Sequence, residues 1–310
     1  MSSQLVTIDC HYVMPQLAAA YLRVEDGEAA FIEVNTAHAV PHLLKALADA
    51  GLKPEAVKYL IVTHVHLDHA GGTSALLAHC PNATVLAHPR AARHLIDPSK
   101  LVTSARGVYG AELFDKLYGD IGPIDAARVK SLDDGATVTL GGATLRFLHT
   151  RGHANHHFVV HDEKQNVVFT GDTFGLVYPA LQRGQRFAFP STSPTDFDGP
   201  AAVDSVKRIM ALKPRAVALT HFGAFEDVDV IGAQLLTWLE LSTKLFDEGK
   251  RSGDEQGTLE QHYKRKLEQA LSDAALEAGL ALTPDDRKLL GFDIELNAQG
   301  LAFAAVKARG

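Results

Sequence analysis

The stretch THVHLDHAGG, residues 63–72, places three histidines and one aspartate within six positions, directly after the apolar run 59–62. Neutral imidazole and carboxylate groups are ligands that zinc and iron take in proteins, and four of them on one loop can converge on a small volume. A solvated polar turn that happens to be rich in histidine is the alternative interpretation. A single loop rarely completes a metal site, so further ligands are expected downstream.

Three later segments repeat the same arrangement, an apolar run of β type followed by a histidine or an aspartate. The runs 145–150, 167–171 and 216–220 lead into His153, Asp172 and His221. Loops at one end of packed strands can gather such side chains on a rigid base. The full set of candidate ligands is His64, His66, Asp68, His69, His153, Asp172 and His221.

The seven candidates divide into ligands for two ions. We assign His64, His66 and His153 to one ion. We assign Asp68, His69 and His221 to a second ion, and Asp172 bridges the two. Zinc is the preferred metal, with iron or manganese as the alternatives. Because only Cys10 and Cys80 are present, histidine and aspartate must hold the metal.

A pair of divalent ions favours hydrolysis. Two ions about 3.5–4 Å apart can bridge a hydroxide at neutral pH, polarise a carbonyl and stabilise the leaving oxygen or sulfur. Asp68 and Asp172 have catalytic roles here because they reduce the positive charge of the site without cancelling it. No basic segment marks a groove for a polyanion. The predicted substrate is therefore a small carboxyl ester, lactone or thioester.

The composition limits the partners and the location. The chain has 310 residues, of which 46% are hydrophobic, and its net charge of −7 predicts no bulk attraction to nucleic acid or to anionic membranes. The first 17 residues lack a basic segment followed by an apolar one, and no run of 18 apolar residues occurs. We expect a cytoplasmic protein that binds a small molecule, with no nucleic acid and no membrane as partner.

The remaining pattern predicts a sheet-rich domain over residues 1–227 and a mainly helical extension over 228–310. Strands are expected at 17–24 and 29–34, a helix at 40–52, and a further helix at 201–212 that begins at a capping sequence, 193–196. Residues 97–125 read as a helical flap beside the metals. Tyr109 of the flap, with Phe174 and Tyr178, is expected to line the substrate pocket.

The extension is predicted to contain helices at 228–246, 259–280 and 284–290. A polar linker is expected at 250–255, and the apolar segment 300–306 is a helix or an edge strand. A stabilising cap and a dimer interface are both consistent with these apolar faces. We expect the extension to close the pocket and to contribute to a homodimer.

The motifs THVHLDHAGG, TRGHANHH, FTGDT and LTHFG together resemble those of the metallo-β-lactamase fold superfamily, over about residues 17–225. The complete ligand set is similar to the binuclear hydrolase branch, which includes glyoxalase II, lactonases and phosphodiesterases. The resemblance implies an α/β fold, a four-layer αβ/βα sandwich with the metals at one edge of two packed sheets. Arg151 stands where many members have proline, and His66 stands where flavodiiron relatives carry glutamate.

Two other functions remain open. The same superfamily includes mononuclear iron persulfide dioxygenases, whose ligands would correspond to His64, His153 and Asp172. A metal-binding interaction or sensor module without catalytic activity is the second alternative. Metal content and oxygen uptake distinguish the first, and inactivity on a broad ester and thioester panel would favour the second.

Overall fold

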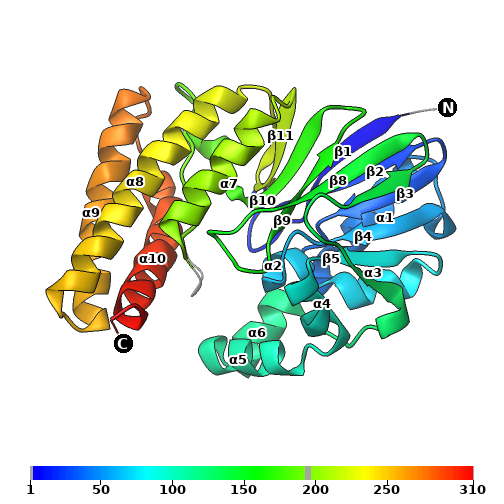
Figure 1. The fold of residues 1–310 in the computed structure, drawn as a ribbon, viewed down its shortest axis with the longest axis horizontal. Coiled ribbons are helices and arrows are strands. Elements are labelled where there is room, and N and C mark those ends of the chain that lie inside the picture. The colour runs from blue at the N-terminus through cyan, green and yellow to red at the C-terminus, as the bar shows by residue number, and fades with distance from the viewer. Residues whose placement is uncertain (1–2, 193–196, 310) are drawn as a thin grey trace. The chain divides into compact units, whose positions relative to one another are not determined.

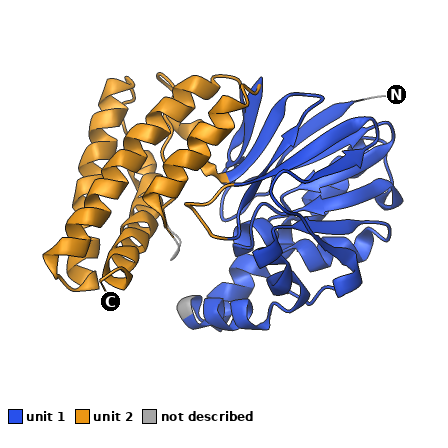
Figure 2. Cartoon of the chain, in the orientation of Figure 1, with its two compact units in different colours: residues 1–149, 156–171, 215–225 blue, residues 150–155, 172–214, 226–310 orange. Residues whose placement is uncertain are grey.

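The computed structural model describes residues 3–192 and 197–309. The chain divides into two compact units, which Figure 2 shows in two colours. Unit 1 contains residues 1–149, 156–171 and 215–225, and unit 2 contains residues 150–155, 172–214 and 226–310. The C-terminal helices thus share a unit with residues 172–214, which the sequence analysis grouped with the first domain.

The described residues form two six-stranded sheets (Figure 1), which belong to unit 1 except for the second half of strand β10, from Asp172 onward. The first sheet is antiparallel across its first three strands and parallel across the others. In spatial order its strands are β1 (Gln4–Asp9), β2 (Ala19–Glu25), β3 (Glu28–Ile32), β4 (Val57–Ile61), β5 (Thr84–Ala87) and β6 (Val129–Ser131). Strand β1 was not predicted, because it is an edge strand whose side chains are mostly only half-buried.

The second sheet contains the strands that precede the later ligand motifs. In spatial order these strands are β12 (Gly223–Phe225), β11 (Ala216–His221), β10 (Val167–Leu176), β9 (Phe158–Asp162), β8 (Ala143–His149) and β7 (Thr137–Leu140). Strand β9 is antiparallel to both β8 and β10. Strands β8 and β10 therefore run in the same direction and end at the same edge of the sheet.

Both faces of the first sheet are buried. Along β3, Phe31 packs into a cluster with the helices and Ile32 into a cluster with the second sheet, because successive side chains of a strand point to opposite faces. The helices of the first cluster are α1 (Val40–Asp49), α3 (Thr73–His79) and α4 (Pro89–Ile96). The expected sandwich with a helical C-terminal extension is confirmed.

The predicted flap forms two helices, α5 (Ser99–Tyr109) and α6 (Ala111–Tyr118). Gly110 between them has φ 76°, a conformation that glycine adopts without steric cost. Phe114 and Tyr118 of α6 form a buried cluster with Leu67, which lies within the first metal motif. The flap therefore packs directly against this motif.

The long helices of unit 2 are α7 (Gly199–Ala211), α8 (Val228–Ser252), α9 (Gln256–Glu277) and α10 (Pro284–Lys307). Helix α7 begins after Asp198, whose side chain accepts a hydrogen bond from the Ala201 N–H. The cap predicted at 193–196 falls outside the described residues. Short 3-10 turns complete the fold at Ala37–Ala39, Pro54–Ala56, Ala126–Arg128 and Pro179–Leu181.

Two predictions about the extension are wrong in detail. Helix α8 continues through part of the expected linker and ends at Gly253, which has φ 78°. Helix α10 joins the segments 284–290 and 300–306 into one helix. Glutamate, leucine, alanine and glutamine at 295–299 favour a helix, so no break separates the two apolar segments.

Helix α10 is long and apolar enough to cross a membrane by length and composition alone, with a mean hydropathy of 1.2. However, 56% of its most apolar window is buried within the protein. The buried Asn297 side chain accepts a hydrogen bond from the Thr192 N–H and donates one to the Pro190 carbonyl. Burial and these hydrogen bonds are typical of a core helix. The length and composition of α10 are therefore only weak evidence for a membrane span.

Candidate metal centre

The first metal motif follows strand β4 and contains the short helix α2 (Leu67–Ala70), which carries Asp68 and His69. The His69 carbonyl accepts hydrogen bonds from the N–H groups of Val34 and Asn35, at 3.0 and 2.9 Å. The Asn35 side chain also donates to the Asp68 carbonyl at 2.7 Å. These bonds hold the loop against the end of β3, so that the ligand side chains start from a fixed backbone.

The buried carboxylate of Glu33 fixes the orientation of two histidines. It accepts a short hydrogen bond from the Thr63 hydroxyl, and Thr63 Oγ1 is 3.0 Å from His64 Nδ1. Its Oε1 also lies 3.2 Å from His69 Nδ1. Because the threonine proton goes to the carboxylate, His64 Nδ1–H donates to Thr63, and the proton of His69 is assigned to Nδ1, which faces the Glu33 carboxylate. Both Nε2 atoms are then left as lone-pair donors, a tautomer that we assign from the network.

Glu33 was missed in the sequence analysis. It directly follows the apolar strand β3, so an acidic side chain at a strand end was the available signal. The signal was weak because Glu33 belongs to none of the four histidine and aspartate motifs.

His221 is oriented by a backbone carbonyl. Its Nδ1 lies 2.8 Å from the Leu17 carbonyl oxygen, to which it donates. The opposite nitrogen, Nε2, is 3.5 Å from Asp68 Oδ2, and His69 Nε2 is 3.7 Å from the same oxygen. Asp68, His69 and His221 thus present three donor atoms to one point.

The geometry of these donors fits a metal ion. In a tetrahedral zinc site with bonds of about 2.0–2.2 Å, ligand atoms lie about 3.3–3.6 Å apart. The distance of 3.5 Å from Asp68 Oδ2 to His221 Nε2 lies in this range, the distance of 3.7 Å to His69 Nε2 is slightly longer, and all donor atoms of the group lie within 4.8 Å of one another. His64 and His69 are completely buried, and His64 Nε2 approaches His66 Nδ1 to 2.8 Å. Unit 1 therefore contains a histidine-rich cluster that suits a divalent metal.

His153 and Asp172 lie in unit 2, where the structure also brings them together. His153 Nε2 is 3.4 Å from Asp172 Oδ2, and both side chains are buried. His153 Nδ1 lies 3.1 Å from the Ser191 carbonyl. A carbonyl on one ring nitrogen again directs the other nitrogen toward a carboxylate, as for His221 in unit 1.

Gly171, which precedes Asp172 in β10, has no room for a side chain. It has φ 49°, and a Cβ atom there would lie 2.5 Å from both Thr63 Oγ1 and His157 Nε2. His157 is completely buried, and its ring centroid is 4.9 Å from that of His64. The FTGDT motif therefore needs glycine for close packing behind the histidine cluster.

The three predicted pocket residues have different surroundings. Tyr109 is 37% exposed at the end of α5. Phe174 is completely buried, and the Tyr178 hydroxyl donates to Asp293 of α10 at 3.3 Å. Phe174 and Tyr178 thus belong to the interior of unit 2, and their pocket role stays a prediction.

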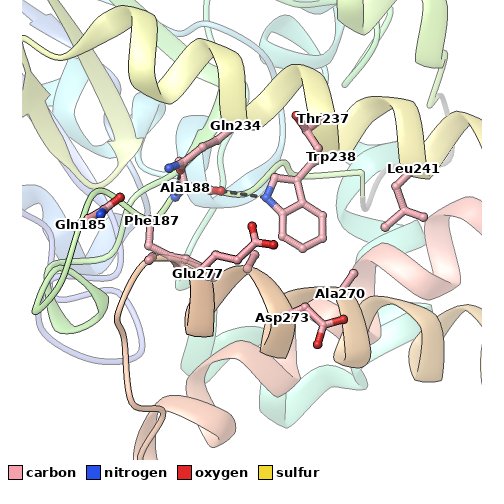
Figure 3. Close-up of a pocket in the computed structure, with 12 residues that line it drawn as sticks. Gln185, Phe187, Ala188, Gln234, Thr237, Trp238, Leu241, Ala270, Asp273 and Glu277 are labelled. Carbon is pink, nitrogen blue, oxygen red and sulfur yellow. Dashed lines mark hydrogen bonds between the residues drawn. The ribbon is translucent and has the colours of Figure 1, made fainter.

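A separate groove lies wholly within unit 2, between α8 and α9 (Figure 3). Its volume is about 440 Å³, and Trp238 forms part of its wall. The indole N–H of Trp238 donates to the Ala188 carbonyl at 3.0 Å, which fixes the neighbouring loop. None of the predicted site residues lines this groove.

Comparison with known proteins gives the family. Residues 27–221 match the profile of the Metallo-beta-lactamase superfamily. The chain therefore belongs to this superfamily, most of whose members are metal-dependent hydrolases. The resemblance seen in the motifs is confirmed.

The metallo-beta-lactamase fold-containing protein ST1585 of Sulfurisphaera tokodaii is 29% identical over 210 residues, which are 64% of this chain and 76% of that protein. Its crystal structure superposes with a TM-score of 0.68 at 23% identity, over 97% of this chain and 99% of that one. This agreement supports the fold over nearly the whole chain, including the C-terminal helices.

Two relatives are named for an activity. The hydroxyacylglutathione hydrolase of Aeromonas hydrophila is 28% identical over 42% of this chain and 37% of that protein. The atrochrysone carboxyl ACP thioesterase of Aspergillus chevalieri is 30% identical over 46% of this chain and 35% of that protein. The matched part is about a third of each relative.

Proposed function

We propose that the protein is a binuclear metal-dependent hydrolase of a small carboxyl ester, lactone or thioester. The observation that carries the proposal is the orientation of His64 and His69 by Glu33, together with the convergence of His69 and His221 on Asp68. Buried imidazoles with one nitrogen already bonded to an acceptor are arranged for metal binding. The relatives named as a thioesterase and an acylglutathione hydrolase support the acyl substrate.

In this proposal His64, His66 and His153 would hold one ion, and Asp68, His69 and His221 would hold the other. Asp172 would serve as a ligand to both. The distance of 3.4 Å between His153 Nε2 and Asp172 Oδ2 supports a joint role for these two side chains.

Bound divalent ions, with zinc as the first choice, would supply a hydroxide nucleophile near neutral pH and polarise the substrate carbonyl. The chain's own residues position the donors and exclude water. The Glu33 carboxylate keeps the proton of His69 on Nδ1, and the Leu17 carbonyl keeps the proton of His221 on Nδ1. The carboxylates of Asp68 and Asp172 would offset part of the positive charge of the two metal ions. The remaining positive charge would stabilise the oxyanion that develops during hydrolysis.

The test combines metal analysis with a substrate panel. Purified protein should bind two equivalents of zinc and should hydrolyse members of a panel of esters, lactones and thioesters. Asp172→Ala should lose both ions, whereas Asp133→Ala, at an exposed carboxylate, should keep them. Two tightly bound ions in the Asp172 variant would contradict the bridging role. A single iron with oxygen uptake would favour the dioxygenase, and inactivity of the doubly loaded protein would favour the sensor.

A homodimer and a cytoplasmic location belong to the same proposal. Unit 2 exposes Leu276 by 79%, Phe292 by 61% and Val230 by 48%, and large apolar side chains are enriched at subunit contacts. Light scattering should give twice the chain mass, and Phe292→Lys should reduce it. A wild-type chain that is monomeric at high micromolar concentration would refute the dimer.

A further inference from the structure

Three tyrosines form a continuous row in unit 1. The ring centroid of Tyr118 is 5.8 Å from that of Tyr109 and 6.3 Å from that of Tyr12. Gly110 reverses the chain between α5 and α6, which brings Tyr109 against Tyr118. We call Tyr12, Tyr109 and Tyr118 the tyrosine row.

The inner end of the tyrosine row contacts the first metal motif. Tyr118 is 95% buried in the cluster that contains Leu67, and Tyr12 packs against the same cluster. Leu67 stands between the proposed ligands His66 and Asp68. Burial raises the pKa of both Tyr12 and Tyr118, so both hydroxyls stay protonated and can donate hydrogen bonds.

The two inner hydroxyls are held loosely. Tyr12 Oη lies 3.4 Å from Tyr118 Oη, which is longer than the usual O–H···O range of about 2.5–3.0 Å. A substrate oxygen can therefore replace this contact at small cost. The inner end of the row is polar, and it lies beside the residues that would hold the metal.

The outer end of the row is exposed, because Tyr109 is 37% exposed. Beside Tyr12, at the other end of the row, the loop exposes Val13 by 66% and Met14 by 43%. Exposed apolar side chains provide a surface for an apolar ligand.

The loop that presents Tyr12 is both fixed and strained. The Asp9 carboxylate accepts hydrogen bonds at 2.9 Å from the N–H groups of His11 and Gln16, which close the loop. Val13 has φ 61°, and the Met14 N–H donates to the Tyr12 carbonyl across it. A β-branched residue in the left-handed region is a costly conformation that concentrates at functional sites. The strain is an observation independent of the tyrosine contacts.

We propose that the tyrosine row binds the acyl part of the substrate, with its two inner hydroxyls on the substrate's carbonyl or leaving-group oxygen and its outer edge on an aromatic acyl group. This inference rests on the proposed hydrolase function and narrows the substrate class to esters or thioesters of aryl-substituted acids. An aromatic group is favoured because rings packed against tyrosine edges gain about 0.5–1.5 kcal/mol beyond area burial.

The test uses zinc-loaded protein and three N-acetylcysteamine thioesters, with acetyl, hexanoyl and phenylacetyl groups. The wild type should have its highest kcat/KM with the phenylacetyl thioester. Tyr109→Ala should reduce kcat/KM for that substrate by about 2- to 12-fold and leave the acetyl thioester unchanged. Tyr118→Phe should reduce kcat/KM for all three substrates to a similar degree, because it removes a bond to the shared thioester group. Tyr59→Phe is the control, because the Tyr59 hydroxyl donates to the Thr139 carbonyl of β7. This variant should keep the kcat/KM of the wild type for all three substrates.

Product binding provides a second readout that needs no turnover. By isothermal titration calorimetry, phenylacetate should bind more tightly than acetate, and Tyr109→Ala should remove the difference. If no thioester is hydrolysed but phenylacetate binding depends on Tyr109, the hydrolase proposal fails and the tyrosine row is supported. If turnover occurs with a preference for the hexanoyl group, or with acyl selectivity unchanged in Tyr109→Ala, the tyrosine row proposal is overturned.

Discussion

Replacing Glu33 with glutamine should weaken metal binding without removing any ligand. The substitution keeps the shape of the side chain but removes the charge that accepts a hydrogen bond from Thr63 and lies 3.2 Å from His69 Nδ1. Through Thr63, the same carboxylate also fixes the ring of His64. One substitution should therefore disturb two metal-binding histidines.

The expected magnitude follows from this geometry. A hydrogen bond to a charged group contributes about 1.5–3 kcal/mol, and loss of an outer partner of a metal-bound histidine lowers affinity by about 10- to 100-fold. A 10- to 100-fold loss corresponds to about 1.4–2.7 kcal/mol, so the two estimates agree. We expect zinc affinity of Glu33→Gln to fall by this factor.

The assay is a competition for zinc between the protein and a chromophoric chelator. Glu28→Gln is the matched control, because Glu28 begins the strand that Glu33 directly follows but forms a half-exposed ion pair with Lys58 at 2.8 Å. The control should bind zinc like the wild type. Equal zinc affinity of Glu33→Gln and the wild type, with both variants folded, would refute the orienting role of Glu33.

Three further predictions concern stability, measured on the metal-free protein by chemical denaturation. Hydrogen bonds from Lys164 and Arg23 lower the pKa of Glu25 to about 2 in the folded protein, so the unfolded chain takes up this proton first as the pH falls. The free energy of unfolding should therefore decrease between about pH 4.5 and about pH 2. Glu25→Gln should flatten this pH dependence, and an unchanged slope in the variant would contradict the role of Glu25. Gly171→Ala should destabilise by about 2–4 kcal/mol because of its positive φ and its contacts with Thr63 and His157, whereas Gly107→Ala, which meets no atom within 4 Å, should be tolerated. Val13→Gly should be about 1 kcal/mol more stable than Val13→Ala, and the reverse order would refute strain at this position.

Much of the fold could be predicted from the sequence because the signals are local. The alternation of apolar residues and the Asp26–Gly27 turn predicted β2 and β3, and helical spacing predicted α1 and α9. Errors arose where local signals were weak or interrupted. Strand β1 is a half-buried edge, and a polar stretch within α10 hid the continuity of that helix.

The division into units was harder to predict, because it depends on packing rather than on local pattern. Residues 172–214 follow the sheet strands directly in the chain, and nothing in their composition groups them with the C-terminal helices. The hydrogen bonds of Asn297 to Pro190 and Thr192 link residues more than 100 positions apart. Sequence separation of this size leaves no local signal.

The sequence by itself determined which side chains could bind a metal, because donor chemistry belongs to residue type and because each ligand follows a recognisable strand. Tertiary structure decided how these side chains are used. Glu33 lies 36 residues from His69, and the Leu17 carbonyl lies 204 residues from His221, yet these groups select which ring nitrogen of each histidine faces the site. A tautomer depends on the hydrogen-bond partner in space, and only the folded chain brings that partner to the ring.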